Sequence, residues 1–239
     1  MGGSYHIASV SWGKDSLCML IELICRNEPL HEVIFYDTGM EFKAIYDTRD
    51  KMIQILKERR IKYTEIEPDY NFEWKMFDKP VNGTKNGFHY GYSWCGGRCR
   101  WGTTDKLKSL DKYAEERNAK MYIGIAADET ERLEKDRKPY KQFPLADFGI
   151  IEKNALEICY TAGFYWMEKG HRLYDLLDRV SCWCCANKNL KELKNIFLYL
   201  PEYWERLKKM QRRTDRPMKG TGKSVFELEE RFIREIGEK

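Results

Sequence analysis

The hydrophobic pattern of the first 125 positions alternates between short apolar runs and longer segments with helical spacing. The short apolar runs predict four strands, at residues 5–10, 31–37, 62–66 and 121–125. The segments with helical spacing predict helices between them, at residues 17–24, 42–60 and 104–117. Because strands that alternate with helices form a sheet with both faces covered, we expect an α/β fold with a mostly parallel sheet.

Two later segments depart from this alternation. Residues 69–100 are rich in Gly, Asn, Tyr and Trp and have weak periodicity, so we expect a lid or substrate loop there. After Pro144 the pattern is mainly helical and predicts helices at residues 152–162, 170–178, 190–200, 202–213 and 224–236. We therefore expect an α/β domain over residues 1–150 and a helical C-terminal lobe over residues 151–239.

Composition narrows the class of protein only moderately. The chain has no apolar run of membrane-spanning length and no charged-then-apolar leader, so we expect a soluble cytoplasmic protein without a membrane partner. Lys and Arg number 42 and Asp and Glu 38, and this mild excess neither requires nor excludes nucleic acid. Residues 212–219 are basic and turn-like, which fits a solvated connector or a contact with phosphate or nucleic acid equally well.

The first predicted strand leads into the hexapeptide Ser-Trp-Gly-Lys-Asp-Ser at residues 11–16, and a predicted helix follows. A glycine there lets the backbone turn tightly, so that amides at the helix N-terminus converge on an anion. Lys14 adds a positive charge, Ser11 and Ser16 offer hydroxyl groups, and Asp15 is suited to orient the loop or help hold Mg²⁺. The sequence therefore predicts a phosphate-binding loop for ATP or an adenylyl compound.

This hexapeptide resembles the Ser-Gly-Gly-Lys-Asp-Ser signature of the PP-loop ATP pyrophosphatases. More narrowly, the chain resembles the phosphoadenosine phosphosulfate (PAPS) reductase family. Asp37-Thr38-Gly39 after the second strand is similar to that family's Asp-Thr-Gly segment, and residues 124–132 resemble its segment with a Gly, a Glu-Ser/Thr pair and an Arg. Three matches in the same order cover roughly the first 150 residues. The resemblance implies a fold of the adenine nucleotide alpha hydrolase-like (PP-loop) type.

The chemistry that the resemblance implies is attack of an acceptor oxygen on the α-phosphorus of ATP, with loss of pyrophosphate. In that chemistry Lys14 and Asp15 are the expected catalytic residues. An ion pair between Arg132 and Glu129 is the alternative to a role for Arg132 in phosphate binding. The residues expected to bind the nucleotide are Ser11, Gly13, Lys14, Asp15, Ser16, Asp37, Thr38 and Arg132.

Two features depart from the family pattern. Trp12 replaces the first Gly of the signature, where it would crowd the loop or offer a nucleotide a stacking surface. The C-terminal Glu-Cys-Gly-(Ile/Leu)-His segment that carries the reductase cysteine has no counterpart here. We therefore expect an activity other than assimilatory PAPS or adenosine phosphosulfate (APS) reduction.

Five of the eight cysteines form two groups that are far apart in the sequence. Cys95 and Cys99 flank two glycines, and Cys182 and Cys185 have the C-x-x-C spacing that binds one metal centre. The two pairs predict a site with four thiolates that brings distant parts of the chain together. For Cys184 three roles stay open: a side chain that points away from this site, an alternate ligand, or a reactive thiol.

A [4Fe-4S] cluster and Zn²⁺ both accept four thiolates, and unligated buried cysteines are a third reading. Trp94, Trp101 and Trp183 would shield a cluster from water, and several members of the family that the chain resembles hold [4Fe-4S] clusters on four cysteines. We therefore expect [4Fe-4S], with Zn²⁺ as the alternative. Lys188 beside the thiolates would offset their charge or face an anionic substrate.

Three functions follow from these features. The first is a PP-loop enzyme that adenylylates an acceptor, or transfers sulfur to or from it, where the acceptor is an unidentified sulfur compound or nucleic acid. The second is a PAPS or APS reductase that uses a thiol such as Cys184 in place of the C-terminal one. The third is a nucleic-acid-binding module stapled by a metal and without catalysis.

Overall fold

A computed structural model describes residues 4–83, 87–135 and 138–237, and for Trp101 it describes the backbone only. The chain forms two compact units, each assembled from several segments. The first consists of the residues up to Asp37, Lys43–Glu67 and Lys106–Trp166, and the second of Thr38–Phe42, Pro68–Asp105 and the residues from Met167. The domain boundary expected at residue 150 stays a prediction.

The first unit is built on a five-stranded sheet in which all neighbouring strands are parallel. Its order is β3-β2-β1-β6-β7, and the strands are β1 (Tyr5–Ser9), β2 (Glu32–Tyr36), β3 (Lys62–Ile66), β6 (Ala119–Ile123) and β7 (Lys141–Gln142). The parallel sheet expected from the sequence is confirmed. β7 has two residues, too few for a periodic pattern to reveal it.

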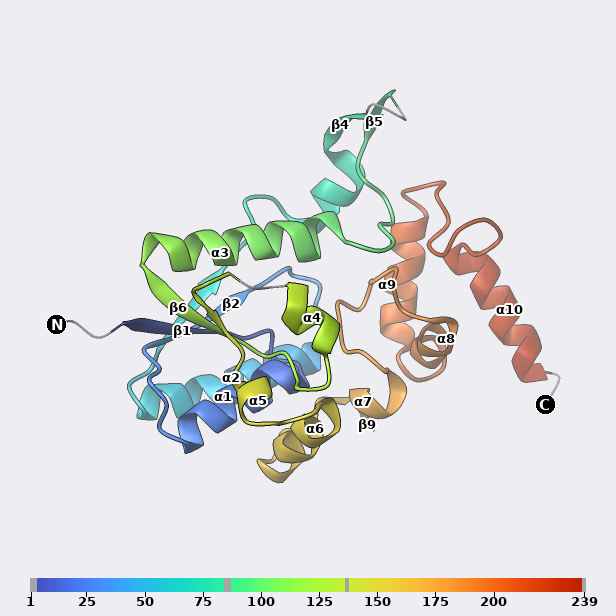
Figure 1. The fold of residues 1–239 in the computed structure, drawn as a ribbon. Helices are drawn as coiled ribbons and strands as arrows, with labels where there is room; N and C mark the ends of the chain where they lie inside the picture. The colour runs from blue at the N-terminus through green and yellow to red at the C-terminus, as the bar shows by residue number, and fades with distance from the viewer. Residues whose placement is uncertain (1–3, 84–86, 136–137, 238–239) are drawn as a thin grey trace. The chain divides into compact units, whose positions relative to one another are not determined.

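Helices cover both faces of this sheet (Figure 1). They are α1 (Lys14–Cys25), α2 (Lys43–Glu58), α3 (Lys106–Glu116), α4 (Thr130–Lys135), α5 (Pro144–Asp147) and α6 (Glu152–Thr161). Figure 1 shows α3 on one face and α1, α2 and α6 on the other. Under α3, apolar side chains of three strands and the helix form a core cluster of Ile7, Ile34, Tyr36, Leu110, Ala114, Ala119 and Met121.

A buried carboxylate sits at the start of β2, beneath α3. Glu32 is fully buried and accepts hydrogen bonds from Thr64 Oγ1, from Tyr113 Oη at 2.8 Å and from Tyr5 Oη at 3.1 Å, while Lys62 Nζ lies 2.9 Å away. Burial alone would raise the pKa of Glu32, but the hydrogen bonds from Thr64, Lys62 and Tyr113 outweigh it and lower the pKa. The ionised side chain therefore links three strands and a helix.

The second unit combines small hairpins with three longer helices. Its strands are β4 (Pro80–Gly83), β5 (Gly87–Tyr90), β8 (Met167–Glu168) and β9 (His171–Arg172). Its α-helices are α7 (Leu173–Leu176), α8 (Leu190–Tyr199), α9 (Pro201–Gln211) and α10 (Val225–Gly237), and two short π-helices are η1 (Trp74–Asp78) and η2 (Arg100–Asp105). Packing of Phe197, Trp204 and Phe232 joins α8, α9 and α10. None of the described helices has the length and apolar character needed to cross a bilayer.

One sequence expectation needs correction in this unit, and the lid or substrate role expected for residues 69–100 stays a prediction. The helix predicted over residues 170–178 is wrong at its start, because β8 and β9 form a hairpin there. Lys169 and Gly170, at its turn, adopt φ of 48° and 83°, values that a right-handed helix does not allow. The segment at residues 69–100 also contains an antiparallel hairpin, β4–β5, that stands out from the rest of the second unit (Figure 1).

Candidate functional site

The predicted phosphate loop lies between β1 and α1, as expected. The Ser11 amide donates to Ser16 Oγ at 3.1 Å, and Ser16 Oγ donates to the Gly13 carbonyl at 3.2 Å, so the loop is closed on the first turn of α1. Gly13 caps the helix without a side-chain hydrogen bond to its amides. An anion at this helix start would therefore meet amides with no competing side-chain cap.

The loop holds Trp12 in a left-handed conformation, with φ of 63°. Its indole is fully buried and packs on Phe35 and Tyr63, with ring centroids 6.1 Å and 5.9 Å away. The Trp12 carbonyl accepts a hydrogen bond from Trp166 Nε1 at 2.7 Å. The suggestion that Trp12 offers a nucleotide a stacking surface is therefore wrong, because the ring belongs to the core of the first unit.

The loop also lies where the order of strands reverses. β1 pairs with β2 on one side and with β6 on the other, so the order of strands reverses between β1 and β6. In such a sheet, ligands bind in a crevice at the carboxyl ends of the two strands at the reversal. Gly124, directly after β6, packs against the start of α1. A Cβ on Gly124 would lie 2.7 Å from Ser16 Cα and 2.8 Å from Ser16 N, so this close approach requires glycine.

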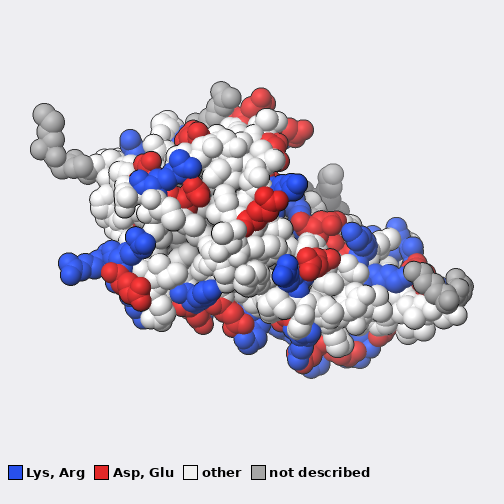
Figure 2. All heavy atoms as spheres, turned by 90° about the horizontal axis from the view of Figure 1, so that it is seen from below, with Lys and Arg blue, Asp and Glu red and all other residues white. Residues whose placement is uncertain are grey.

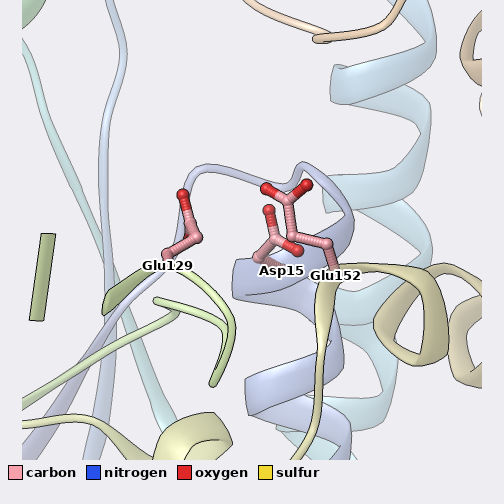
Figure 3. A group of neighbouring side chains, drawn as sticks. All are labelled: Asp15, Glu129 and Glu152. Carbon is pink, nitrogen blue, oxygen red and sulfur yellow. The ribbon is translucent and has the colours of Figure 1, made fainter. Parts of the chain in front are cut away.

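Three carboxylates meet beside the loop (Figure 3). One oxygen from each of Asp15, Glu129 and Glu152 lies within 4.8 Å of the other two. Lys14 Nζ donates to Asp15 Oδ1 at 2.7 Å and lies 3.6 Å from Glu152. Burial raises the pKa of Asp15, Lys14 opposes this and the two glutamates add to it. Glu152 was not predicted from the sequence, because there it resembles any acidic residue in the first turn of a helix.

The remaining predicted nucleotide residues have other partners in the structure. Asp37 accepts a hydrogen bond from Tyr46 Oη at 2.8 Å. Arg132 forms the ion pair with Glu129 that was its alternative, and about half of its side chain is exposed. Thr38 belongs to the second unit, where its hydroxyl lies 3.3 Å from Glu41 Oε1 and 3.6 Å from Cys182 Sγ. Their roles toward a nucleotide stay predictions.

The second unit contains a cavity of about 130 Å³ walled by cysteines. Cys95, Cys99, Cys182 and Cys185 all line it, so the structure brings the two distant pairs to one place. Cys184 lines it too, which is not the outward orientation suggested as one alternative. The other lining residues are mostly apolar or small, and are Phe72, Met76, Trp94, Gly102, Thr103, Ser181, Ala186 and Asn187.

Local hydrogen bonds explain why the two cysteine loops meet. The Gly97 amide donates to Asn187 Oδ1 at 2.8 Å, and Asn187 Nδ2 donates to the Gly97 carbonyl at 2.7 Å. Gly97 has φ of 67°, which turns the first loop toward the second. Trp94 and Trp183 are buried, whereas the side chain of Trp101 lies outside the described residues. The cysteine spacing does not predict this pair of hydrogen bonds between Gly97 and Asn187.

The spacing of the sulfur atoms bears on which centre fits. Among the described residues, no three cysteine sulfurs lie within 4.8 Å of one another. Four thiolates on one Zn²⁺, with bonds of about 2.3 Å, would stand about 3.8 Å apart. A [4Fe-4S] cluster takes one thiolate at each of four irons and spreads them further. The donor set that the cavity brings together, four thiols in a mostly apolar wall, therefore suits a thiolate-bound metal centre.

Charged groups of both signs lie around the cavity and act in opposite directions on its thiols. Burial raises the pKa of Cys182 and Cys184 well above 9.0, with Glu41 and neighbouring cysteines adding to the effect. Lys188 is 2% exposed, and its ammonium lies 3.2 Å from Ser181 Oγ. Burial lowers the pKa of Lys188, while Cys185 and Glu192 oppose this. A buried ammonium beside thiols is stabilised when a metal centre makes those thiols anionic.

The chain is similar to known proteins in sequence. The family model of the phosphoadenosine phosphosulfate reductase domain matches residues 5–143, more than half of the chain. A relative in Methanocaldococcus jannaschii, uncharacterized protein MJ0066, is 26% identical over 211 residues. The match covers 84% of this chain and 40% of that protein, so the chain spans less than half the length of this curated relative.

The fold is similar to that of a solved structure. The U34-tRNA thiolase NcsA from Methanococcus maripaludis, with its [4Fe-4S] cluster, aligns with a TM-score of 0.47 and 15% identity. The alignment covers 99% of this chain and 74% of that chain.

Proposed function

Because the chain belongs to the phosphoadenosine phosphosulfate reductase domain family, a family of PP-loop enzymes, we propose that it binds ATP or another adenosine phosphate at residues 11–16. With that nucleotide it adenylylates an acceptor, or transfers sulfur to or from it. The observation that carries the proposal is the close packing of Gly124 on the uncapped start of α1, at the reversal of strand order.

The residues of the loop divide the work of such a reaction. As the acceptor oxygen bonds to the α-phosphorus, the bond to the bridging oxygen breaks and pyrophosphate leaves with the electron pair. The amides of the first turn of α1 and the Lys14 ammonium are placed to stabilise this departing charge. Asp15, Glu129 and Glu152 offer the carboxylate oxygens that Mg²⁺ prefers, and Mg²⁺ there would offset further phosphate charge.

The cysteine cavity supplies the second part of the proposal. Cys95, Cys99, Cys182 and Cys185 hold a [4Fe-4S] cluster, with Zn²⁺ as the alternative. Such a cluster, when bound, supplies one-electron chemistry to the site. The apolar wall with Trp94 keeps water from the thiolates, and Lys188 offsets their charge.

The nucleotide part is tested by calorimetric titration with an ATP analogue that resists cleavage between the α- and β-phosphates. Lys14→Ala should bind it at least about tenfold more weakly, because charge-assisted hydrogen bonds contribute about 1.5–3 kcal/mol each. Lys153→Ala, at an exposed lysine of α6, is the matched control and should bind like the wild type. Equal affinity of the two variants contradicts the proposed loop function.

The metal part is tested by anaerobic purification and reconstitution. The wild type should be brown and contain iron and acid-labile sulfide, and Cys99→Ser should lose both. Cys25→Ser, at an exposed cysteine of the first unit, is the control and should keep them. If stoichiometric zinc persists and no iron is taken up, the cysteines form a structural zinc site instead.

Reduction of PAPS or APS is a second candidate function, because Cys184 gives the cavity one thiol more than a centre with four ligands requires. It predicts thioredoxin-dependent release of sulfite from PAPS or APS, and loss of that release in Cys184→Ser. Its burial argues against ready formation of a nucleophilic thiolate. Absence of sulfite release by the iron-loaded wild type would eliminate this candidate.

A further inference from the structure

The net positive charge of the chain belongs to one of its two units. The residues of the second unit include 22 Lys and Arg against 17 Asp and Glu, whereas the first unit has 20 against 21. The face seen in Figure 2 carries both signs side by side, with no patch of one sign. The excess is concentrated instead in residues 206–223, here called the cationic segment, which hold eight basic residues and one acidic residue.

The cationic segment runs from the second half of α9 into the connection to α10, and it lies against both cysteine loops. Thr214 Oγ1 lies 2.7 Å from Ser93 Oγ, next to Trp94 of the cavity wall. Lys219 Nζ donates to the carbonyl of Ala186, also of the cavity wall, at 2.7 Å. A polyanion on this segment would therefore pass beside the cavity.

One basic residue fastens this segment to the base of the β4–β5 hairpin. Arg213 pairs with Glu73 at 2.7 Å and with Asp78 at 2.9 Å, and its guanidinium lies over the Phe77 ring at 4.2 Å. Lys209 and Arg212 are exposed, and neither forms an ion pair with a carboxylate of the described residues. Arg213 thus holds the segment in place while its neighbours keep their charge for a partner.

The hairpin itself presents aromatic rings to solvent. Phe88 and Tyr90 are 63% and 66% exposed, and their ring centroids lie 5.2 Å apart. They are two residues apart on β5, so they project from the same face of the strand. At the foot of the hairpin the exposed ring of Tyr70 stacks on Trp74 at 4.4 Å. Exposed rings beside a cationic segment match the flat bases and the phosphates of an unpaired strand.

We infer that this surface binds single-stranded RNA, with bases stacked on Phe88 and Tyr90 and phosphates along the cationic segment. Unpaired bases are the ordinary state of RNA loops, whereas in a duplex the stacked pairs hide the faces that these rings would contact. One part of this inference rests on the proposed function, namely that the bound RNA strand is also the acceptor that is adenylylated or thiolated. The binding itself does not depend on it.

The test measures fluorescence anisotropy of a labelled single-stranded RNA of about 15 nucleotides, without nucleotide cofactor. Phe88→Ala with Tyr90→Ala should weaken binding at least about tenfold, because two stacking surfaces are lost. Tyr165→Ala, an exposed aromatic residue of the first unit, should bind within about twofold of the wild type. All these residues are exposed, so the variants should fold.

The charge contribution has its own readout in the salt dependence. Lys209→Gln with Arg212→Gln should reduce the slope of log affinity against log salt by about 1.4, at about 0.7 for each lost phosphate contact. Lys57→Gln with Lys112→Gln, at two exposed lysines of the first unit, should leave the slope unchanged. A general loss of charge would instead lower the slope equally in both pairs.

Three outcomes overturn the inference. They are unchanged RNA affinity in the aromatic variant, equal or tighter binding of a duplex DNA of the same sequence, and displacement of RNA by phosphatidylserine vesicles that capture the protein. Titration of the aromatic variant with the ATP analogue separates the two proposals. If only the RNA inference is wrong, Phe88→Ala with Tyr90→Ala binds both the RNA and the ATP analogue like the wild type, and Lys14→Ala still binds the analogue weakly. If only the proposed function is wrong, the aromatic variant loses RNA affinity as expected, and Lys14→Ala binds the analogue like the wild type.

Discussion

Gly124→Ala tests whether the close packing of β6 on α1 shapes the nucleotide site. The added Cβ would lie 2.7 Å from Ser16 Cα, 2.8 Å from Ser16 N and 2.9 Å from Asp15 C. All three are backbone atoms at the start of α1, and ordinary contact begins at 3.4 Å. The helix start must therefore move by about 0.7 Å relative to the strand end, since no flexible side chain can yield in its place.

This displacement has two measurable costs. Overpacking of this kind destabilises a core by about 1–3 kcal/mol. A shift of about 0.7 Å takes an amide–phosphate hydrogen bond of about 2.9 Å beyond the range in which it is effective. Loss of one hydrogen bond to a charged group costs about 1.5–3 kcal/mol, so the affinity for the ATP analogue should fall about 10- to 100-fold.

The assay is calorimetric titration with the ATP analogue, together with urea unfolding to show that the variant is folded. Gly237→Ala is the matched control, because nothing lies within 4 Å of a Cβ at that position. It should bind the analogue like the wild type. A folded Gly124→Ala protein that binds within about twofold of the wild type would refute the reasoning, because the loop would then bind without the glycine contact.

Three further outcomes follow from the structure. Trp12→Gly should lower the free energy of unfolding in urea by about 1–4 kcal/mol, because loss of a buried indole, about 3–5 kcal/mol, exceeds relief of left-handed strain, about 1–2 kcal/mol; a more stable variant contradicts this. The lowered pKa of Glu32 stabilises the fold fully above its ordinary value of 4.5, so wild-type stability should fall as the pH drops through the lowered pKa, and unfolding of Glu32→Gln should show a flatter pH dependence. Lys188→Met should have the circular dichroism spectrum of the wild type but hold less iron after anaerobic reconstitution. Lys191→Met, at an exposed lysine, should hold as much iron as the wild type. Equal iron in the two variants would contradict the proposed charge role of Lys188.

The sequence alone determined the elements whose signal is local. β1, β2, β3 and β6 and most helices were predicted from local apolar patterns. β1, β2 and β6 have buried residues, and β3 at the sheet edge has side chains that are at most partly buried. The phosphate loop was predicted because its residues are contiguous and their chemistry is specific to anions. Family membership, carried by three short segments, was predicted on the same ground and is confirmed by the match over residues 5–143.

Only the tertiary structure decided what depends on distant residues meeting. Glu152 joins Asp15 through the docking of α6 on α1, and no pattern in the sequence distinguishes it from a solvated glutamate. The burial of Trp12 depends on Phe35 of the neighbouring strand β2 and on Tyr63 of β3, one strand further. Cys184 faces the cavity because of a backbone turn, in which the Cys185 amide donates to the Cys182 carbonyl at 3.0 Å. Sequence spacing specifies neighbours along the chain, whereas packing selects neighbours in space, and these residues meet only through packing.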